Sequence, residues 1–289
     1  WLWMIILFSF VLQAVSYEFQ SKLGNLFGKR TYQYFLVANG IIGPVLLGAA
    51  VATFFNGSNF VVSKGNITQE AMPVISQWAN GWHGLDALLD LWNVVLGLAV
   101  LFLSRCLGIL YFINNVSDAE LLPRFRRRLM VEAVCFVVFF VPFVIYVLLK
   151  DGFAVDAASG SIVIESYKYF HNLMAMPWVL GLFLLGVVAV LFGLGRSILC
   201  ATYNKGIWFA GVGTVLAVLA LLLTVGYNNT AYYPSAADLQ SSLTLSNSCS
   251  SLFTLKTMAY VSVFIPFVLA YIIYAWRAID RKPITADEM

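Results

Sequence analysis

Charged side chains are scarce in this sequence. Aspartate, glutamate, lysine and arginine make up 11% of its 289 residues, whereas soluble domains carry about 25%. Apolar residues make up 61% of the chain. So little charge on so apolar a chain excludes a water-soluble globular protein. The formal net charge of +3 indicates no nucleic-acid partner, because the basic residues gather in short segments between long apolar runs.

Histidine and cysteine are also rare, and their spacing matches no known metal-binding or disulfide pattern. The four cysteines include no CxxC pair, which argues against a disulfide framework or a zinc site. The two histidines, His83 and His171, lie outside the apolar runs, whereas a haem ligand in a bundle projects from a helix into the interior. No HExxH, Walker or GxSxG motif occurs. The sequence therefore predicts no catalytic residue, no metal site and no haem bound by this chain alone.

Long apolar runs are what the sequence has in abundance. A run of about 20 residues matches the roughly 30 Å hydrocarbon core of a bilayer, where only a helix satisfies its own backbone groups. The chain is predicted to be an all-α polytopic transmembrane helical bundle, one integral membrane domain over residues 1–289 with a polar tail at 277–289. Seven spans are expected, at Trp1–Ser16, Tyr32–Phe55, Asp86–Phe112, Leu129–Leu149, Met174–Leu194, Ile207–Tyr227 and Leu255–Trp276.

The loops between these spans carry an asymmetric charge. Arg124, Arg126, Arg127 and Arg128 crowd one loop, and most of the other lysines and arginines lie in alternate loops on the same side. Basic loops stay in the cytoplasm. The pattern predicts that the C-terminus is cytoplasmic and that residues 228–254 form an outer loop. A second outer loop, residues 150–172, alternates in polarity and is expected to hold a short hairpin.

The first residues of the chain support a separate prediction. The sequence opens at Trp1 without an initiator methionine, inside an apolar run that ends near Gln13 and is too short to span a bilayer. No positively charged signal-peptide region precedes that run. We expect on these grounds a fragment that begins partway along a transmembrane helix.

Ionisable residues at or inside the spans are the first candidates for function in a membrane protein. Arg105 lies within span three, where pairing with a carboxylate or extension toward the headgroups is the preferred interpretation. Glu132 is placed in the first turn of span four, complementing the helix dipole. Asp86 and Asp90 lie one turn apart at the outer end of span three. They are either solvated or able to receive a proton or a cation.

Glu18 closes span one at its inner end and precedes Lys22 by four residues. This spacing permits a surface ion pair along one helix face. Taken alone, the residue is best interpreted as such a pair.

A resemblance to a known family is carried by a late stretch of the chain. Tyr233-Pro234-Ser235 precedes a serine-rich run and a Thr-Leu-Lys-Thr-Met sequence that opens span seven. This stretch resembles the last outer loop and last helix of subunit II of the cytochrome bd-type quinol oxidases. Glu18-Phe19-Gln20-Ser21-Lys22 resembles the acidic end of the family's third helix. The matching motif residues are Ser242, Thr244, Asn247, Ser251 and Thr254.

The resemblance implies a nine-helix subunit of which the first two helices are absent here. It implies a heterodimer in the bacterial inner (cytoplasmic) membrane with a subunit I that holds haem b and haem d, and it allows for a small accessory subunit. The expected reaction is reduction of O2 to water by quinol, with membrane lipid and quinone as further partners. This chain would stabilise subunit I and line a proton path through Glu18, Gln13 and Arg105. At two of these positions the chain departs from the family, which often has an arginine at Gln13 and a glutamine at Arg105.

Two other classes of function remain open from the residues alone. A secondary transporter or permease typically shows paired broken helices. The only pair of similar segments in this sequence is Val141-Pro142-Phe143-Val144 and Ile265-Pro266-Phe267-Val268. A purely structural membrane subunit would differ from the leading interpretation only in lacking a proton path.

Overall fold

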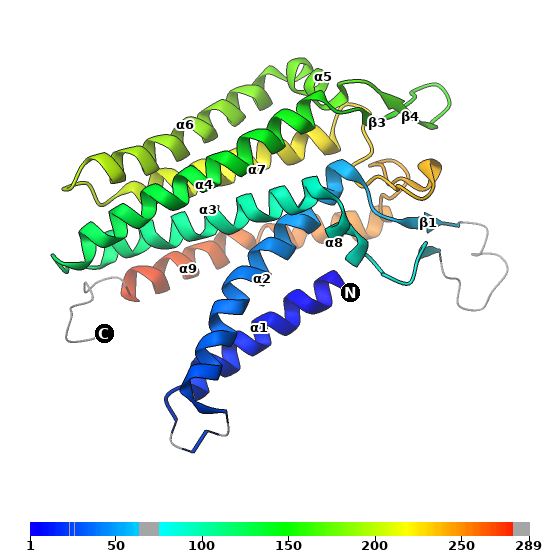
Figure 1. Cartoon of the computed structure of the whole chain (residues 1–289). Helices are drawn as coiled ribbons and strands as arrows, with labels where there is room; N and C mark the ends of the chain where they lie inside the picture. The colour runs from blue at the N-terminus through cyan, green and yellow to red at the C-terminus, as the bar shows by residue number, and fades with distance from the viewer. Residues whose placement is uncertain (23, 26, 64–74, 280–289) are drawn as a thin grey trace.

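The computed structural model describes residues 1–22, 24–25, 27–63 and 75–279. Seven helical segments in this part of the chain are long and apolar enough to cross a membrane, which confirms the predicted all-α bundle (Figure 1). They are α1 (Leu2–Phe19), α2 (Gly28–Asn56), α3 (Leu91–Asn115), α4 (Leu121–Leu149), α6 (Pro177–Leu199), α7 (Gly206–Gly226) and the pair α8 (Leu252–Ser262) and α9 (Ile265–Ile279).

Three of the predicted boundaries are wrong, each for a local reason. The third span begins at Leu91, because residues before it form the 3-10 helix η2 (Leu85–Leu89). The fourth span begins at Leu121, so the four arginines lie in its first turns and not in a loop. The fifth begins at Pro177, whose fixed φ suits a first helical position. The residues before it form the short helix α5 (Lys168–Ala175).

The predicted tail is partly helical, and the seventh span is interrupted. Arg277 lies in the last turn of α9, which ends at Ile279, and the remaining tail falls outside the described residues. Between α8 and α9 the chain turns at Val263 and Phe264, immediately before Pro266. A proline removes the backbone donor of a helical turn and clashes with the carbonyl four residues earlier, so a break at this place is expected.

Two short hairpins and a long loop cover the end of the bundle opposite to the arginines (Figure 1). The predicted hairpin forms from β3 (Gly152–Val155) and β4 (Ile162–Glu165), paired antiparallel. A second hairpin, β1 (Phe60–Val62) with β2 (Ser76–Trp78), was not predicted. Single bridges join Ser58 to Ser235 and Ala154 to Thr230, so residues 228–251, which include the short 3-10 helix η3 (Leu239–Ser241), lie across both hairpins.

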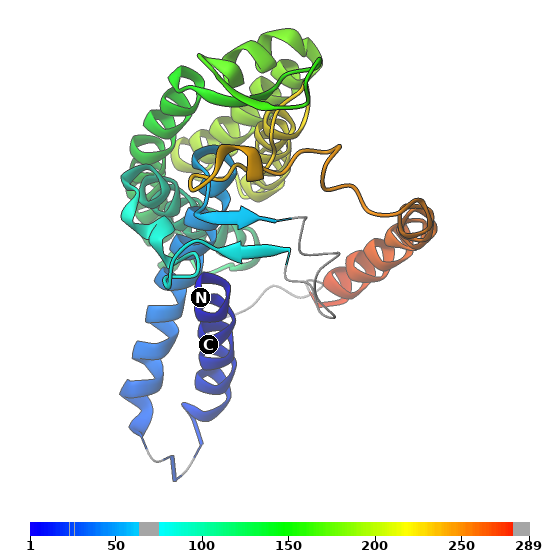
Figure 2. The same ribbon diagram turned by 90° about the vertical axis from the view of Figure 1, so that its right-hand side faces the viewer.

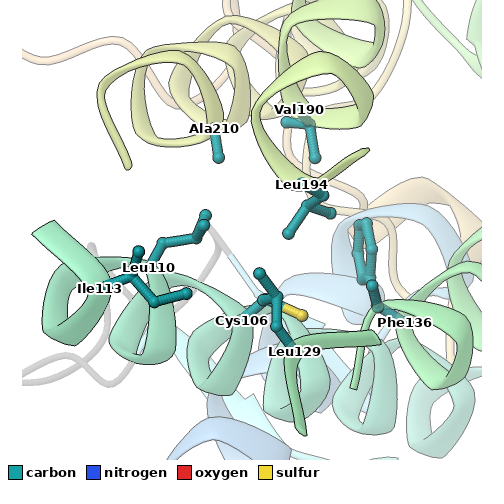
Figure 3. Close-up of a cluster of buried hydrophobic side chains, with 9 residues drawn as sticks. Cys106, Leu110, Ile113, Leu129, Phe136, Val190, Leu194 and Ala210 are labelled. Atoms are coloured by element: carbon teal, nitrogen blue, oxygen red, sulfur yellow. The ribbon is translucent and has the colours of Figure 1, made fainter. Parts of the chain in front are cut away.

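Buried apolar side chains join α3 and α4 to α6 and α7. Figure 3 shows this cluster, in which Leu110 and Ile113 of α3 and Leu129 and Phe136 of α4 point toward Val190 and Leu194 of α6 and Ala210 of α7. Close approach of the helix backbones depends on small residues. A Cβ built at Gly186 would lie 2.6 Å from the backbone nitrogen of Ala217, and one at Gly48 would lie 2.7 Å from the Cα of Gly97.

The pair α8 and α9 lies apart from the other helices (Figure 2). None of its described residues is buried, and its aromatic contact with the bundle is Trp276 against Tyr111 of α3, at 6.2 Å between ring centroids. An apolar helix of this length without packed neighbours in its own chain leaves a large apolar surface to be covered.

Candidate functional site

Glu18 forms the ion pair that its spacing predicts. Its Oε1 lies 2.5 Å from Nζ of Lys22, and the two side chains are 59% and 54% exposed. The pair closes α1 at the end of the bundle where the arginines lie. An exposed pair of this kind contributes little to stability, because solvent screens the two charges. Its geometry within this chain is therefore that of a surface charge, and a role in the assembled complex stays a prediction.

Gln13 contacts a polar residue that the sequence analysis missed. Nδ2 of Asn39, which is 7% exposed, donates to Oε1 of Gln13 at 2.5 Å. This hydrogen bond joins α1 to α2 inside the spans, where few alternative partners exist for an amide. A lone asparagine between Ala38 and Gly40 in an apolar run is the sequence signal from which this contact could have been predicted.

Asp86 and Asp90 do not share a helix face, which corrects the prediction of a paired carboxylate site. Asp90 is the N-cap of α3, and its Oδ1 accepts from the backbone N–H groups of Trp92 and Asn93. Asp86 lies in η2, where its Oδ2 accepts from the side-chain amides of Asn59 and Asn80. Each carboxylate therefore accepts hydrogen bonds that stabilise the chain around the start of α3.

A half-buried lysine at the same end was overlooked in the sequence. Nζ of Lys150 donates to the carbonyl of Phe55 at 2.9 Å and to Oδ1 of Asn56 at 2.7 Å. Tyr146 donates to the same amide oxygen, while Nδ2 of Asn56 donates to Asn93. Lys150 thus places a cation at the C-terminus of α2, where the helix dipole favours one. Burial lowers the pKa of Lys150 from 10.5 to about 8, although the nearby charges of Asp90 and Asp151 act in the opposite direction.

Arg105 has a buried carboxylate partner, as the preferred interpretation required. Its Nη2 lies 2.7 Å from Oε1 of Glu132, and Nε of Arg128 lies 2.7 Å from the same oxygen. The side chain of Glu132 is 2% exposed. The prediction that Glu132 lies in the first turn of its helix is wrong, since α4 begins at Leu121. A carboxylate this deep is stable only with cationic partners, and the two arginines supply them.

Arg126 lies on another face of α4 and is buried. Its guanidinium donates to the backbone carbonyls of Ser197, Cys200, Ala201 and Tyr203. It also donates to Oδ1 of Asn204 at 2.9 Å. These carbonyls lie at the end of α6 and in the turn to α7, where a helix leaves carbonyls without intrahelical partners; that of Cys200 also accepts from the backbone N–H of Tyr203. The arginine therefore acts as a cap supplied by a neighbouring helix and is no part of a solvated basic loop.

The family-motif residues hold together the loop of residues 228–251. Oγ of Ser242 accepts from the backbone N–H of Ser235, and Oδ1 of Asn247 accepts from that of Thr244. Oγ of Ser251 caps α8 by accepting from the N–H of Thr254. A hollow of about 940 Å³ lies between this loop and the β1–β2 hairpin, and Phe60, Trp78, Tyr233 and Asn247 contribute to its walls. The motif thus has a structural role in fixing where the seventh span leaves the bundle.

Comparison with known proteins agrees with these features. A family model described as cytochrome bd terminal oxidase subunit II matches residues 1–279. The chain belongs to this family. Subunits named cytochrome bd-I ubiquinol oxidase subunit 2 from the Escherichia coli strains K12, O6:H1 and O157:H7 are each 24% identical to it over 300 residues. The matched region covers 96% of this chain and 72% of each relative.

Family membership confirms the resemblance seen in the outer loop and makes this subunit II chain part of a terminal oxidase, an oxidoreductase complex. With seven apolar spans and bacterial relatives, it is a multi-pass membrane protein of bacterial type.

The histidines of this subunit II chain are placed poorly for binding a haem within the bundle. His83 is exposed, and its ring stacks on Trp1 at 6.0 Å between centroids. His171 is also exposed, with Nδ1 3.2 Å from Oε1 of Glu165. Both lie outside the spans. Within the described part of the chain, no three His, Cys, Asp or Glu side chains are grouped to hold a metal ion.

Proposed function

We propose that this chain is the haem-free subunit of a quinol oxidase in the bacterial inner membrane, where it pairs with a haem-bearing subunit I. The complex would reduce O2 to water with electrons from quinol. The observation that carries the proposal is the seventh span, whose described residues are all left unburied by this chain. The similarity to the ubiquinol oxidase subunits of Escherichia coli supports the same activity.

The seventh span presents both apolar side chains and backbone polar groups to its surroundings. Phe267, Leu269 and Tyr271 are more than half exposed. At the break before Pro266, the proline has no N–H with which to satisfy the carbonyl of Ser262. In lipid such groups need partners from protein. Helices of subunit I covering α8 and α9 would meet both requirements.

Haem b and haem d belong to subunit I in this proposal. The support from this chain is that His83 and His171 are exposed and lie at its outer end, outside the spans. Expressed alone in haem-replete membranes, the chain should show no Soret band. A stoichiometric haem that disappears in His83→Ala or His171→Ala would contradict this division of labour.

Pairing can be tested by making part of the seventh span polar. Val268→Ser with Leu269→Ser removes two side chains that are 55% and 52% exposed on α9. The double variant should carry less subunit I, and therefore less haem, through purification on a tag on this chain. The matched control is Val188→Ser with Leu184→Ser on α6, where exposure is 62% and 53%. Equal haem recovery from both variants would overturn the proposed interface.

A proton path at the inner end of α1 is the finer part of the proposal. Glu18 and the Gln13–Asn39 hydrogen bond supply polar groups along this helix. Glu18→Gln should lower quinol oxidase turnover or haem retention, because an acid in a relay or beside a partner has no neutral substitute. Lys22→Gln removes the other half of the ion pair and should have little effect. If both substitutions leave turnover and the haem spectrum unchanged, Glu18 is a surface charge only.

A further inference from the structure

The cluster formed by Arg105, Glu132 and Arg128 is not electrically neutral. Two guanidinium groups face one carboxylate, which leaves a net charge of +1. Both arginines contact the same oxygen, Oε1, and no other hydrogen bond or ion pair is made by either guanidinium within the described part of the chain. A guanidinium carries several N–H donors in a planar fork. Most of these donors therefore remain available.

The carboxylate is enclosed, whereas the two arginines are open to the surroundings. Glu132 is 2% exposed, but the side chains of Arg105 and Arg128 are 40% and 59% exposed. The cluster lies at the contact of α3 and α4, and Arg126 points to α6 and α7 instead. Glu132 thus fixes the positions of two guanidinium groups on the outer surface of the helix pair. Preorganised arginines of this kind are common ligands of oxyanions such as carboxylate and phosphate.

The depth of the cluster places it near the boundary of the hydrocarbon. Helix α4 has 29 residues and is about 43 Å long, which exceeds the roughly 30 Å hydrocarbon core by more than two turns. The excess is accounted for by its polar first turns, up to Arg128. Arg105 lies deeper, but its side chain reaches the same carboxylate oxygen as Arg128. This is the level at which lipid phosphates lie.

We propose that Arg105 and Arg128 form a binding site for a phosphoryl oxyanion, with Glu132 as the residue that positions them. The anion supplies the negative charge that the cluster lacks and accepts hydrogen bonds from the unused guanidinium donors. Two sources carry this chemistry, the headgroup of an anionic phospholipid and free phosphate.

Binding is measured on the assembled oxidase purified in a neutral detergent and stripped of lipid. Short-chain phosphatidylglycerol, short-chain phosphatidylcholine and inorganic phosphate are titrated separately at constant ionic strength. The number of retained lipids is read by native mass spectrometry, and the thermal midpoint is followed in parallel. We expect phosphatidylglycerol to bind more tightly than phosphatidylcholine. Competition by inorganic phosphate would identify the free anion as an equivalent ligand, and its failure would identify the lipid.

Variants of the cluster distinguish lipid binding at this site from lipid binding elsewhere on the complex. Arg128→Gln keeps the Arg105–Glu132 pair but lowers the net charge to zero, and should weaken phosphatidylglycerol binding about fivefold. Arg124→Gln, on the same helix but without contact to Glu132, is the control and should change it little. Glu132→Gln keeps an Oε1 acceptor that can hold the two guanidinium groups in place but raises the net charge, so it should strengthen binding, whereas a fold that is merely damaged would bind less.

The proposal is overturned by any of three results. The first is equal affinity for the two lipids together with no effect of inorganic phosphate. A second is equal weakening by Arg124→Gln and Arg128→Gln, which would indicate a diffuse charge effect. The third is weaker binding in Glu132→Gln while the thermal midpoint of the lipid-free complex is unchanged.

Discussion

Two polar side chains, one buried and one half-buried, close the ends of neighbouring helices in this molecule. Lys150 donates to the end of α2, and Arg126 donates to the end of α6. Each belongs to α4 or to the residue directly after it. The carbonyls of Phe55 and Cys200 each have a second donor, the hydroxyl of Tyr169 and the backbone N–H of Tyr203. Without Arg126, the carbonyls of Ser197 and Ala201 would lose their donor near the hydrocarbon boundary, where unpaired groups are costly.

Arg126→Met should destabilise the protein markedly. The substitution keeps much of the apolar stem but leaves the carbonyls of Ser197 and Ala201 without their donor. We expect a loss of about 2–3 kcal/mol, seen as a lower thermal midpoint in detergent. Arg127→Met changes the neighbouring exposed arginine and should alter the midpoint little. Similar midpoints for the two variants would show that the cap contributes nothing.

Lys150 makes stability depend on pH in the alkaline range. Its pKa is about 8 in the folded protein against an ordinary 10.5, so between these values the unfolded chain binds more protons than the folded one. Stability attributable to this residue therefore rises as the pH increases from about 8 to about 10.5. Lys150→Met should remove that rise. Thermal midpoints at pH 7.5 and 9.5 test it, and an identical pH response in the two proteins would contradict the assignment.

Contacts between helices depend on where the glycines lie on each helix. Gly186 of α6 faces α7, and a Cβ there would lie 2.6 Å from the nitrogen of Ala217 and 2.8 Å from the carbonyl of Gly213. Gly181 lies on the same helix, and a Cβ there would have nothing within 4 Å. The two positions therefore separate the packing role of glycine from its effect on helix propensity.

Gly186→Ala should destabilise the protein because both atoms in the way belong to backbone. Overpacking of this kind costs about 1–3 kcal/mol. Gly181→Ala meets no neighbour and should be neutral or stabilising by up to about 1 kcal/mol, since alanine favours helix more than glycine does. Thermal midpoints of the pair provide the measurement. A drop in Gly181→Ala equal to that in Gly186→Ala would refute the proposed contact of α6 with α7.

At the scale of the whole molecule, the two ends of the bundle differ in character. One end carries the arginines of α4 and the turn after α6, and the other carries both hairpins and the motif loop (Figure 1). Two native cysteines with exposed side chains mark these ends. Cys200 follows α6 at the first, and Cys249 lies in the motif loop at the second.

These cysteines allow the predicted orientation to be tested without new labelling sites. In intact cells, an impermeant maleimide should label Cys249 and leave Cys200 unmodified, because the basic end is expected in the cytoplasm. Cys249→Ser should abolish the labelling, while Cys200→Ser should preserve it. After the membrane is permeabilised, both residues should react. Labelling of Cys200 alone in intact cells would reverse the topology.

The sequence by itself determined the class of fold and the family. Apolar runs of bilayer length force helices because lipid offers no other partner to the backbone, and this reason is independent of neighbouring segments. The i,i+4 pair of Glu18 and Lys22 and the β3–β4 hairpin followed from local spacing in the same way. The motif around Ser242 and Asn247 indicates the family without any knowledge of the tertiary structure.

Only the tertiary structure decided which polar residues meet. Arg105 and Glu132 are 27 positions apart on two helices, and Arg126 reaches carbonyls more than 70 positions away. Such pairings depend on how two helices are rotated and staggered, and helix periodicity leaves that choice open. The starts of α3 and α4 differ from the predicted ones for a local reason instead, since caps and polar first turns extend or shorten a helix relative to its apolar run. The exposure of the seventh span is likewise a property of packing, because its mean hydropathy of 2.0 lies within the range of 1.7 to 2.6 of the other six spans.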